Sequence, residues 1–155
     1  MAGESLRFQD RGGGESRCLF CFGGESMYRL VTNNPLARQY WAVSECNHIS
    51  IRWLEGGLPD VLVAARDMVH VGWRLLNHPL ASGLRPSQTP YKTLILARGK
   101  CLDYQSLQVL EGALAIVQKQ AAFPGGSERV LADLQLIDVE MCKEVLEQIR
   151  RGVSV

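Results

Sequence analysis

The sequence of 155 residues has no long apolar run and no excess of charge of one sign. There are 17 basic and 16 acidic residues, and no run of like charge is longer than two. Such a mixed chain lacks the basic surface that nucleic-acid binding usually requires. No segment approaches the roughly 18 consecutive apolar residues of a membrane span, and none resembles a secretory signal. We therefore expect a cytoplasmic protein with no nucleic-acid partner and no membrane partner.

Motifs for nucleotides, nucleophilic serines and metals are also missing. There is no G-x-G-x-x-G after a strand, no G-x-x-x-x-G-K-[ST] and no G-x-S-x-G. Cys18 and Cys21 form a single C-x-x-C in Gly-rich surroundings without a second pair, which favours an incidental pair over a redox or zinc site. His70 and His78 are eight residues apart, with no third ligand at a diagnostic spacing. We expect free thiols, no cofactor and no metal.

Residues 1–26 differ from the rest of the chain. They contain six of the 15 glycines and repeat Gly-Glu-Ser three times. This composition buries little apolar surface, so we predict a flexible leader followed by a single α/β domain over residues 27–155. Because Met27 directly precedes a predicted strand, we also hypothesise that Met27 is the native start and that residues 1–26 are not part of the native product. N-terminal mass spectrometry of protein from the native host tests this.

Strand-like and helix-like segments alternate after residue 27. Apolar runs and period-2 patterns predict strands over 28–31, 46–54 and 92–97, the last one buried on both faces. Capping residues (Asn34, Asp103 and Asp138) and helical periodicity predict helices over 35–41, 59–76 and 103–122, a short helix over 127–136 and a last one over 139–150. The order of the main elements, β-α-β-α-β-α-α, predicts an α/β fold. We expect a small, mostly parallel three-stranded sheet with helices on both faces.

The predicted helix over 59–76 has a wide apolar arc and a narrow polar stripe. Arg66, Asp67, His70 and Arg74 lie on this stripe. A solvated face explains Asp67 and Arg74 well, since neighbouring charges on a helix contribute only about 0.2–0.5 kcal/mol per pair. We select Arg66 and His70 as candidate site residues.

Residues 77–91 form a fifteen-residue connection with three prolines. Connections of this length without helix or strand are usually functional or disordered, and the prolines argue against disorder. With the polar stripe and Asn33, they supply a set of hydrogen-bond donors suited to a small phosphate or carboxylate: Asn33, Arg66, His70, His78, Ser82, Arg85, Tyr91 and Lys92. In a parallel sheet, however, this connection starts at the edge opposite to the carboxyl ends of the strands. Either it folds back over the sheet, or Asn33 lies outside the site.

Several short segments resemble GrdX-type proteins. They are Val31-Thr-Asn-Asn-Pro-Leu36, Arg66-Asp-Met-Val-His70-Val-Gly72, Leu75-Leu-Asn-His-Pro-Leu80, Arg85-Pro86 and Thr89-Pro-Tyr-Lys92. The resemblance covers about residues 28–150, and Asn77 and Ala81-Ser82 depart from its pattern, so we leave Ser82 out of the expected site. GrdX-type proteins are encoded alongside glycine, sarcosine and betaine reductase components in anaerobic bacteria that ferment amino acids.

The resemblance implies an accessory protein of reductive amino-acid metabolism. We expect it to bind a small anionic metabolite or a partner protein such as a glycine reductase component. The ligand-binding residues we expect are Asn33, Arg66, His70, His78, Arg85, Tyr91 and Lys92. One alternative is a small enzyme that uses His70 or His78 as general acid/base. Another is a structural adaptor without a ligand, in which these residues stiffen the connection through internal hydrogen bonds.

Overall fold

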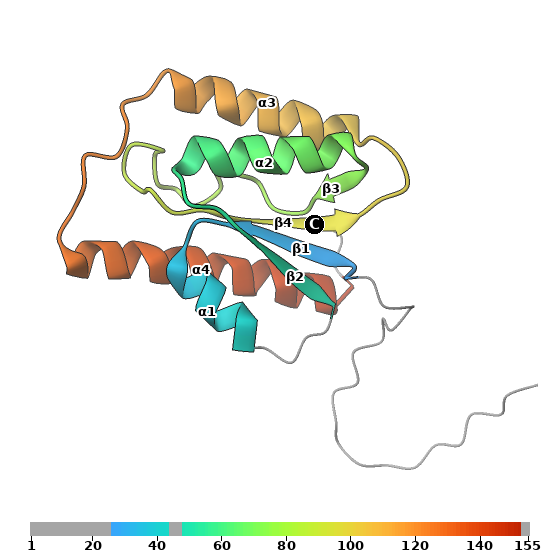
Figure 1. The fold of residues 1–155 in the computed structure, drawn as a ribbon, viewed down its shortest axis with the longest axis horizontal. Coiled ribbons are helices and arrows are strands. Elements are labelled where there is room, and N and C mark those ends of the chain that lie inside the picture. The colour runs from blue at the N-terminus through green and yellow to red at the C-terminus, as the bar shows by residue number, and fades with distance from the viewer. Residues whose placement is uncertain (1–25, 44–47, 153–155) are drawn as a thin grey trace, which may run out of the picture.

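A computed structural model describes residues 26–43 and 48–152 of the chain. The predictions on the leader and on Cys18 and Cys21, and the first two residues of the strand predicted over 46–54, lie outside these residues. The elements, in order, are β1 (Tyr28–Thr32), α1 (Pro35–Val43), β2 (Ile49–Trp53), α2 (Leu58–His70), β3 (Trp73–Leu75), β4 (Thr93–Arg98), α3 (Tyr104–Gln118) and α4 (Glu128–Arg150) (Figure 1).

The strands form one mixed sheet in the order β2-β1-β4-β3. β1 and β2 are parallel, whereas β4 is antiparallel to both β1 and β3. The α/β class is therefore confirmed, but the prediction of a mostly parallel three-stranded sheet is wrong in detail. The reason is the additional strand β3, which crosses the sheet once more before β4 and so reverses the direction of β4.

β3 lies in a segment that the sequence pattern assigned to the second helix. α2 ends at His70, because Gly72 adopts a φ of +95°, with which a right-handed helix cannot continue. The backbone of Gly72 then approaches the chain after β4, where Gly99 N donates to Gly72 O at 2.9 Å. The alternation of Trp73, Arg74 and Leu75 fits a strand as well as a helix over so few residues, which is why periodicity failed to find it.

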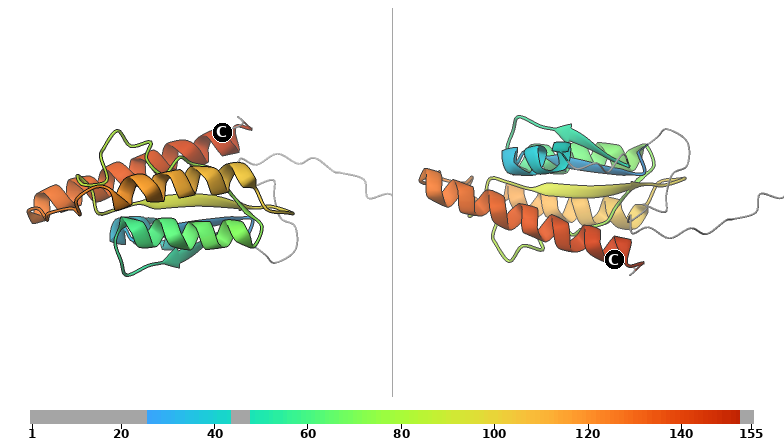
Figure 2. Two further views of the ribbon diagram at one scale, coloured as in Figure 1. Left: turned by 90° about the horizontal axis from the view of Figure 1, so that it is seen from above. Right: turned by 90° about the horizontal axis from the view of Figure 1, so that it is seen from below.

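The helices cover both faces of the sheet, as predicted (Figure 1, Figure 2). α2 and α3 pack on one face, against Val31, Leu94 and Leu96. α1 and α4 cover the other face, where Leu30 and Ile95 meet Cys142 and Leu146. Successive side chains of the central strand β4 thus point in turn into the two cores, as expected for a strand buried on both faces. Among the described residues, no helix combines the length and the apolar character that crossing a membrane demands.

α4 is one continuous helix, which corrects the prediction of two helices separated near Asp138. Ser127 caps its start by accepting a hydrogen bond from Val130 N. Asp138 does not cap a helix; it lies in the middle of α4 with 7% of its surface exposed. Its carboxylate binds the sheet, accepting hydrogen bonds from Thr93 N at 2.9 Å and from Thr93 Oγ1 at 2.6 Å. This tertiary contact offsets the weak helix propensity of aspartate at that position.

Candidate functional site

The antiparallel direction of β4 brings the expected donors of two segments to one edge of the sheet. Thr32, the last residue of β1, is paired with Thr93, the first residue of β4. Their hydroxyl oxygens are 2.7 Å apart. The connection over 76–92 therefore arrives at the carboxyl ends of β1 and β2 without folding back. Asn33 and Lys92, the residues beyond this pair, lie next to each other.

Asn33 joins three segments at this edge. Its Nδ2 donates to Gly56 O at 2.9 Å and to Pro90 O at 2.7 Å. Its Oδ1 accepts from Lys92 N at 2.9 Å. The side chain is buried and its hydrogen-bonding groups are engaged within the protein. This arrangement indicates a structural role for Asn33 rather than a free donor for a ligand.

A small cavity of about 250 Å³ opens between the connection, the start of β4 and α4. Polar side chains line one part of it and apolar side chains the rest. Its lining consists of Asn77, His78, Ala81, Lys92, Thr93, Asp138, Met141, Cys142 and Val145. Of the residues selected from the sequence, His78 and Lys92 lie here, and the lining adds Asn77, Thr93, Asp138 and Cys142.

Lys92 is the most unusual group of this cavity, because only 6% of its surface is exposed. Within the described part of the chain, its ammonium forms no hydrogen bond and no ion pair. Burial lowers the pKa of Lys92 below its ordinary value of 10.5, and the charge of Asp138 acts in the opposite direction. Burial also raises the pKa of the Cys142 thiol above its ordinary range, with a further contribution from Asp138. Cys142 is thus an uncharged neighbour of the lysine.

The Asp138 carboxylate is held in place by three hydrogen bonds. Besides the two from Thr93, Oδ2 accepts one from Asn34 Nδ2 at 2.9 Å. An ionised carboxylate offers about four acceptor positions, so one of them is not used by these donors. Asp138 and Lys92 both line the cavity but form no direct ion pair within the described residues.

Asn77 and His78 form the side of the cavity at the start of the connection. Asn77 Nδ2 donates to Thr93 O at 3.0 Å, and its Oδ1 accepts from Ile95 N at 2.7 Å, which fixes this side chain along β4. His78 is exposed, and its Nδ1 accepts from Leu80 N at 3.1 Å. This bond requires an unprotonated Nδ1, so the neutral ring has its proton on Nε2.

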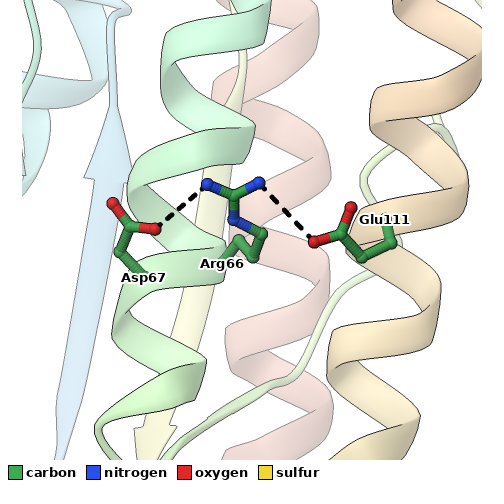
Figure 3. A network of polar contacts seen from close by, with 3 residues as sticks. All are labelled: Arg66, Asp67 and Glu111. Carbon is green, nitrogen blue, oxygen red and sulfur yellow. Dashed lines mark hydrogen bonds and ion pairs between the residues drawn. The ribbon is translucent and has the colours of Figure 1, made fainter.

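Arg66 does not take part in this cavity. Its guanidinium forms an ion pair with Asp67 of the same helix at 3.3 Å and one with Glu111 at 3.5 Å, and the second pair connects α2 with α3 (Figure 3). These helices cover the face of the sheet opposite to α4. The sheet therefore lies between Arg66 and the cavity.

His70 also lies away from the cavity. It is exposed at the carboxyl end of α2, two residues before Gly72, which contacts Gly99 beyond the far end of β4. Lys92 precedes the opposite end of that strand. Arg66 and His70, which we expected in one ligand site with His78 and Lys92, therefore do not line this cavity.

The remaining donors of the connection lie outside the lining. Arg85 is exposed, and its backbone N donates to Gln88 Oε1 at 2.9 Å. Tyr91 is partly buried, and its backbone bonds to the hydroxyl of Thr89. Ser82 is partly buried and does not line the cavity either. Of the expected ligand-binding residues, the cavity lining thus contains His78 and Lys92, and residues of α4 form another part of it.

The sequence contained one signal for the residues that were missed. Leu134, Asp138, Cys142 and Leu146 recur every four residues and are all buried. An acidic residue within such an apolar stripe needs a partner on the surface that the helix covers. In the described residues, no group of three or more histidine, cysteine, aspartate or glutamate side chains could hold a metal ion.

The architecture defines an α/β protein with a mixed four-stranded sheet and a lysine-containing cavity beneath its last helix. Residues 29–147 match the model of a protein family described as GrdX-like protein. The match covers most of the chain, so the chain belongs to the GrdX-like family, as the short segments around Asn33, His70 and Lys92 indicated. Comparisons with curated proteins and with solved structures found no match.

Proposed function

We propose that this protein is an accessory protein of glycine reductase metabolism that binds a small metabolite with an anionic group at Lys92. The family name supports the metabolic context. The observation that carries the binding role is Lys92, a largely buried residue that lines a cavity and whose ammonium has no hydrogen bond or ion pair with the described side chains. Glycine reductase components are the protein partners that the same name suggests.

An unpaired ammonium in this position is unfavourable for the protein alone. Removal of a charged group from water costs several kcal/mol unless hydrogen bonds or an opposite charge replace the hydration. Asp138 supplies part of that replacement from a distance. A carboxylate or phosphate oxygen placed in the cavity would supply the rest through a charge-assisted hydrogen bond. The folded protein therefore gains stability when such a group binds.

Thermal unfolding with a panel of small anions tests the proposal. Acetate, propionate, alanine and phosphate are added at increasing concentrations, and Tm is recorded by fluorescence or circular dichroism. A ligand present at 100 times its Kd adds about 2.7 kcal/mol of stability, which raises Tm by several degrees. Lys92→Met should abolish this rise. Without ligand, Lys92→Met should be as stable as the unsubstituted protein or more so, because the substitution removes a desolvated charge.

Lys100→Met is the matched control. Lys100 is exposed in the turn after β4, at the end of the strand far from Lys92. This variant should keep the full ligand-induced rise in Tm. The proposal is wrong if no compound of the panel raises Tm, or if Lys92→Met responds as the unsubstituted protein does.

Of the two candidate catalytic histidines, His78 is the one for which a catalytic role has support. His78 lines the cavity with Lys92, whereas His70 lies at the other end of the sheet. An imidazole in the cavity lining could act as a general acid or base toward a bound molecule. NMR of protein incubated with each compound of the panel tests this alternative. Consumption of a compound that His78→Gln abolishes would support it, and unchanged spectra would refute it for these compounds.

A further inference from the structure

Two side chains of opposite charge line the same cavity without forming an ion pair with each other. Lys92 and Asp138 are 6% and 7% exposed, and both contribute to the cavity wall. The lysine ammonium has no hydrogen bond within the described residues, and the carboxylate has one acceptor position left. The cavity lining thus contains a cationic and an anionic side chain that do not form an ion pair with each other.

We infer that the ligand of this cavity is a small zwitterion, with a carboxylate at Lys92 and an ammonium at Asp138. This inference rests on the proposed binding role of Lys92 and specifies the chemical class of its ligand. An α-amino acid with a short aliphatic side chain has the two charged groups that the cavity complements.

The Asp138 carboxylate disfavours a ligand with negative charge alone. A carboxylate bound at Lys92 also experiences the charge of Asp138, which repels it in the low dielectric of a buried site. An ammonium on the same ligand removes this repulsion and forms a hydrogen bond with the free acceptor position. The affinity for the zwitterion therefore exceeds the affinity for the corresponding simple acid.

Asp138 cannot move away to relieve that repulsion. Thr93 binds its carboxylate through both backbone N and side-chain Oγ1, and Asn34 Nδ2 binds it from the start of α1. These bonds tie α4 to β4 and to the end of β1. The negative charge is consequently a fixed part of the cavity that a ligand must accommodate.

The other walls of the cavity limit the size and polarity of the ligand. Ala81, Met141 and Val145 provide apolar surface, and the volume is about 250 Å³. Cys142 adds a further uncharged wall, because its thiol is buried and its pKa is raised. This surface favours a short aliphatic group and disfavours a third charge on the ligand.

Three related compounds separate the contributions of the two charges. Alanine carries both groups, propionate lacks the ammonium, and ethylammonium lacks the carboxylate. Their Kd values for the full chain are measured at pH 7 by NMR titration or by the concentration dependence of Tm. We expect alanine to bind at least tenfold more tightly than propionate, and ethylammonium to bind more weakly than alanine.

Variants assign this preference to the two side chains. Lys92→Met should weaken the binding of alanine and of propionate, whereas Asp138→Asn should reduce the preference for alanine over propionate. Since Asp138 ties several elements together, Asp138→Asn can fail to fold; the series of compounds on the unsubstituted protein then decides alone. If propionate binds as tightly as alanine and Lys92→Met abolishes both, the zwitterion inference fails and the proposed function stands. If none of the three compounds binds, both fail.

Discussion

Replacement of Asn33 by alanine should destabilise the protein without any ligand being involved. The side chain forms three hydrogen bonds of 2.7 to 2.9 Å, which hold together the end of β1, Gly56 before α2, and the residues before β4. Alanine keeps none of them. It leaves Gly56 O, Pro90 O and Lys92 N without the partners that Asn33 provides.

The magnitude follows from these three bonds. A typical intramolecular hydrogen bond contributes about 0.5–1.5 kcal/mol net, so loss of three costs about 3 kcal/mol. The hydrogen bond from Lys92 N is buried, which places its share at the upper end of that range. Total stabilities of single domains are about 5–15 kcal/mol, so this loss is a large part of the free energy of unfolding.

Equilibrium unfolding in urea, followed by far-UV circular dichroism at pH 7, measures the effect. The midpoint should fall while the slope of the transition stays unchanged. Gln39→Ala is the control, because Gln39 is an exposed polar residue on α1 and its replacement should change stability by less than about 0.5 kcal/mol. A loss below about 1 kcal/mol for Asn33→Ala would contradict the assigned structural role.

Further predictions concern the helix pair, the buried titratable groups and the turn into β3. Arg66→Met should cost at most about 1 kcal/mol in urea unfolding and leave ligand-induced changes in Tm intact, since its ion pairs are solvent-exposed. As pH rises toward 10.5, unfolding experiments should show a gain in stability that Lys92→Met lacks, because the folded state releases the Lys92 proton before the unfolded state does. Above pH 9.0 an opposing loss should appear that Cys142→Ala lacks, since only the unfolded state ionises this thiol readily. Gly72→Ala should lower stability by about 1–3 kcal/mol because of its positive φ, whereas Gly112→Ala, in the open middle of α3, should raise it by about 0.5–1 kcal/mol.

Local signals in the sequence were sufficient for most elements. The apolar run after Lys92 predicted the central strand, because only a strand buried on both faces accommodates it. Asp103 predicted the start of α3, where its carboxylate accepts a hydrogen bond from Ser106 N. Asn34 predicted the start of α1, and its Oδ1 accepts from Leu36 N at 3.0 Å. In each case the residues that determine the element lie within a few positions of it.

The strand directions and the cavity depend on contacts between distant residues. β3 has only three residues, and its pairing with β4 joins segments more than 20 positions apart in the sequence. Asp138 has the residue type of a helix cap, yet its partners are Thr93 and Asn34, 45 and 104 positions away. A pattern within a window of one helix cannot distinguish a capping aspartate from one that binds a neighbouring sheet. The position of Asp138 on the stripe of Leu134, Cys142 and Leu146 is the feature that does so.

The reversal of β4 determines which candidate residues can act together. In a wholly parallel sheet, the connection over 76–92 would begin at the amino ends of the strands, on the same edge as His70. Because β3 carries the chain across the sheet first, the connection reaches the carboxyl ends of β1 and β2, the edge at which open α/β sheets commonly bind ligands. Because of this one additional strand, His78 and Lys92 line the same cavity as Asp138 of α4, whereas His70 lies at the far edge of the sheet. The affinity for a ligand that binds at Lys92 should therefore be unchanged by His70→Ala and altered by substitutions in α4. This holds although His70 is closer to His78 in the sequence than α4 is.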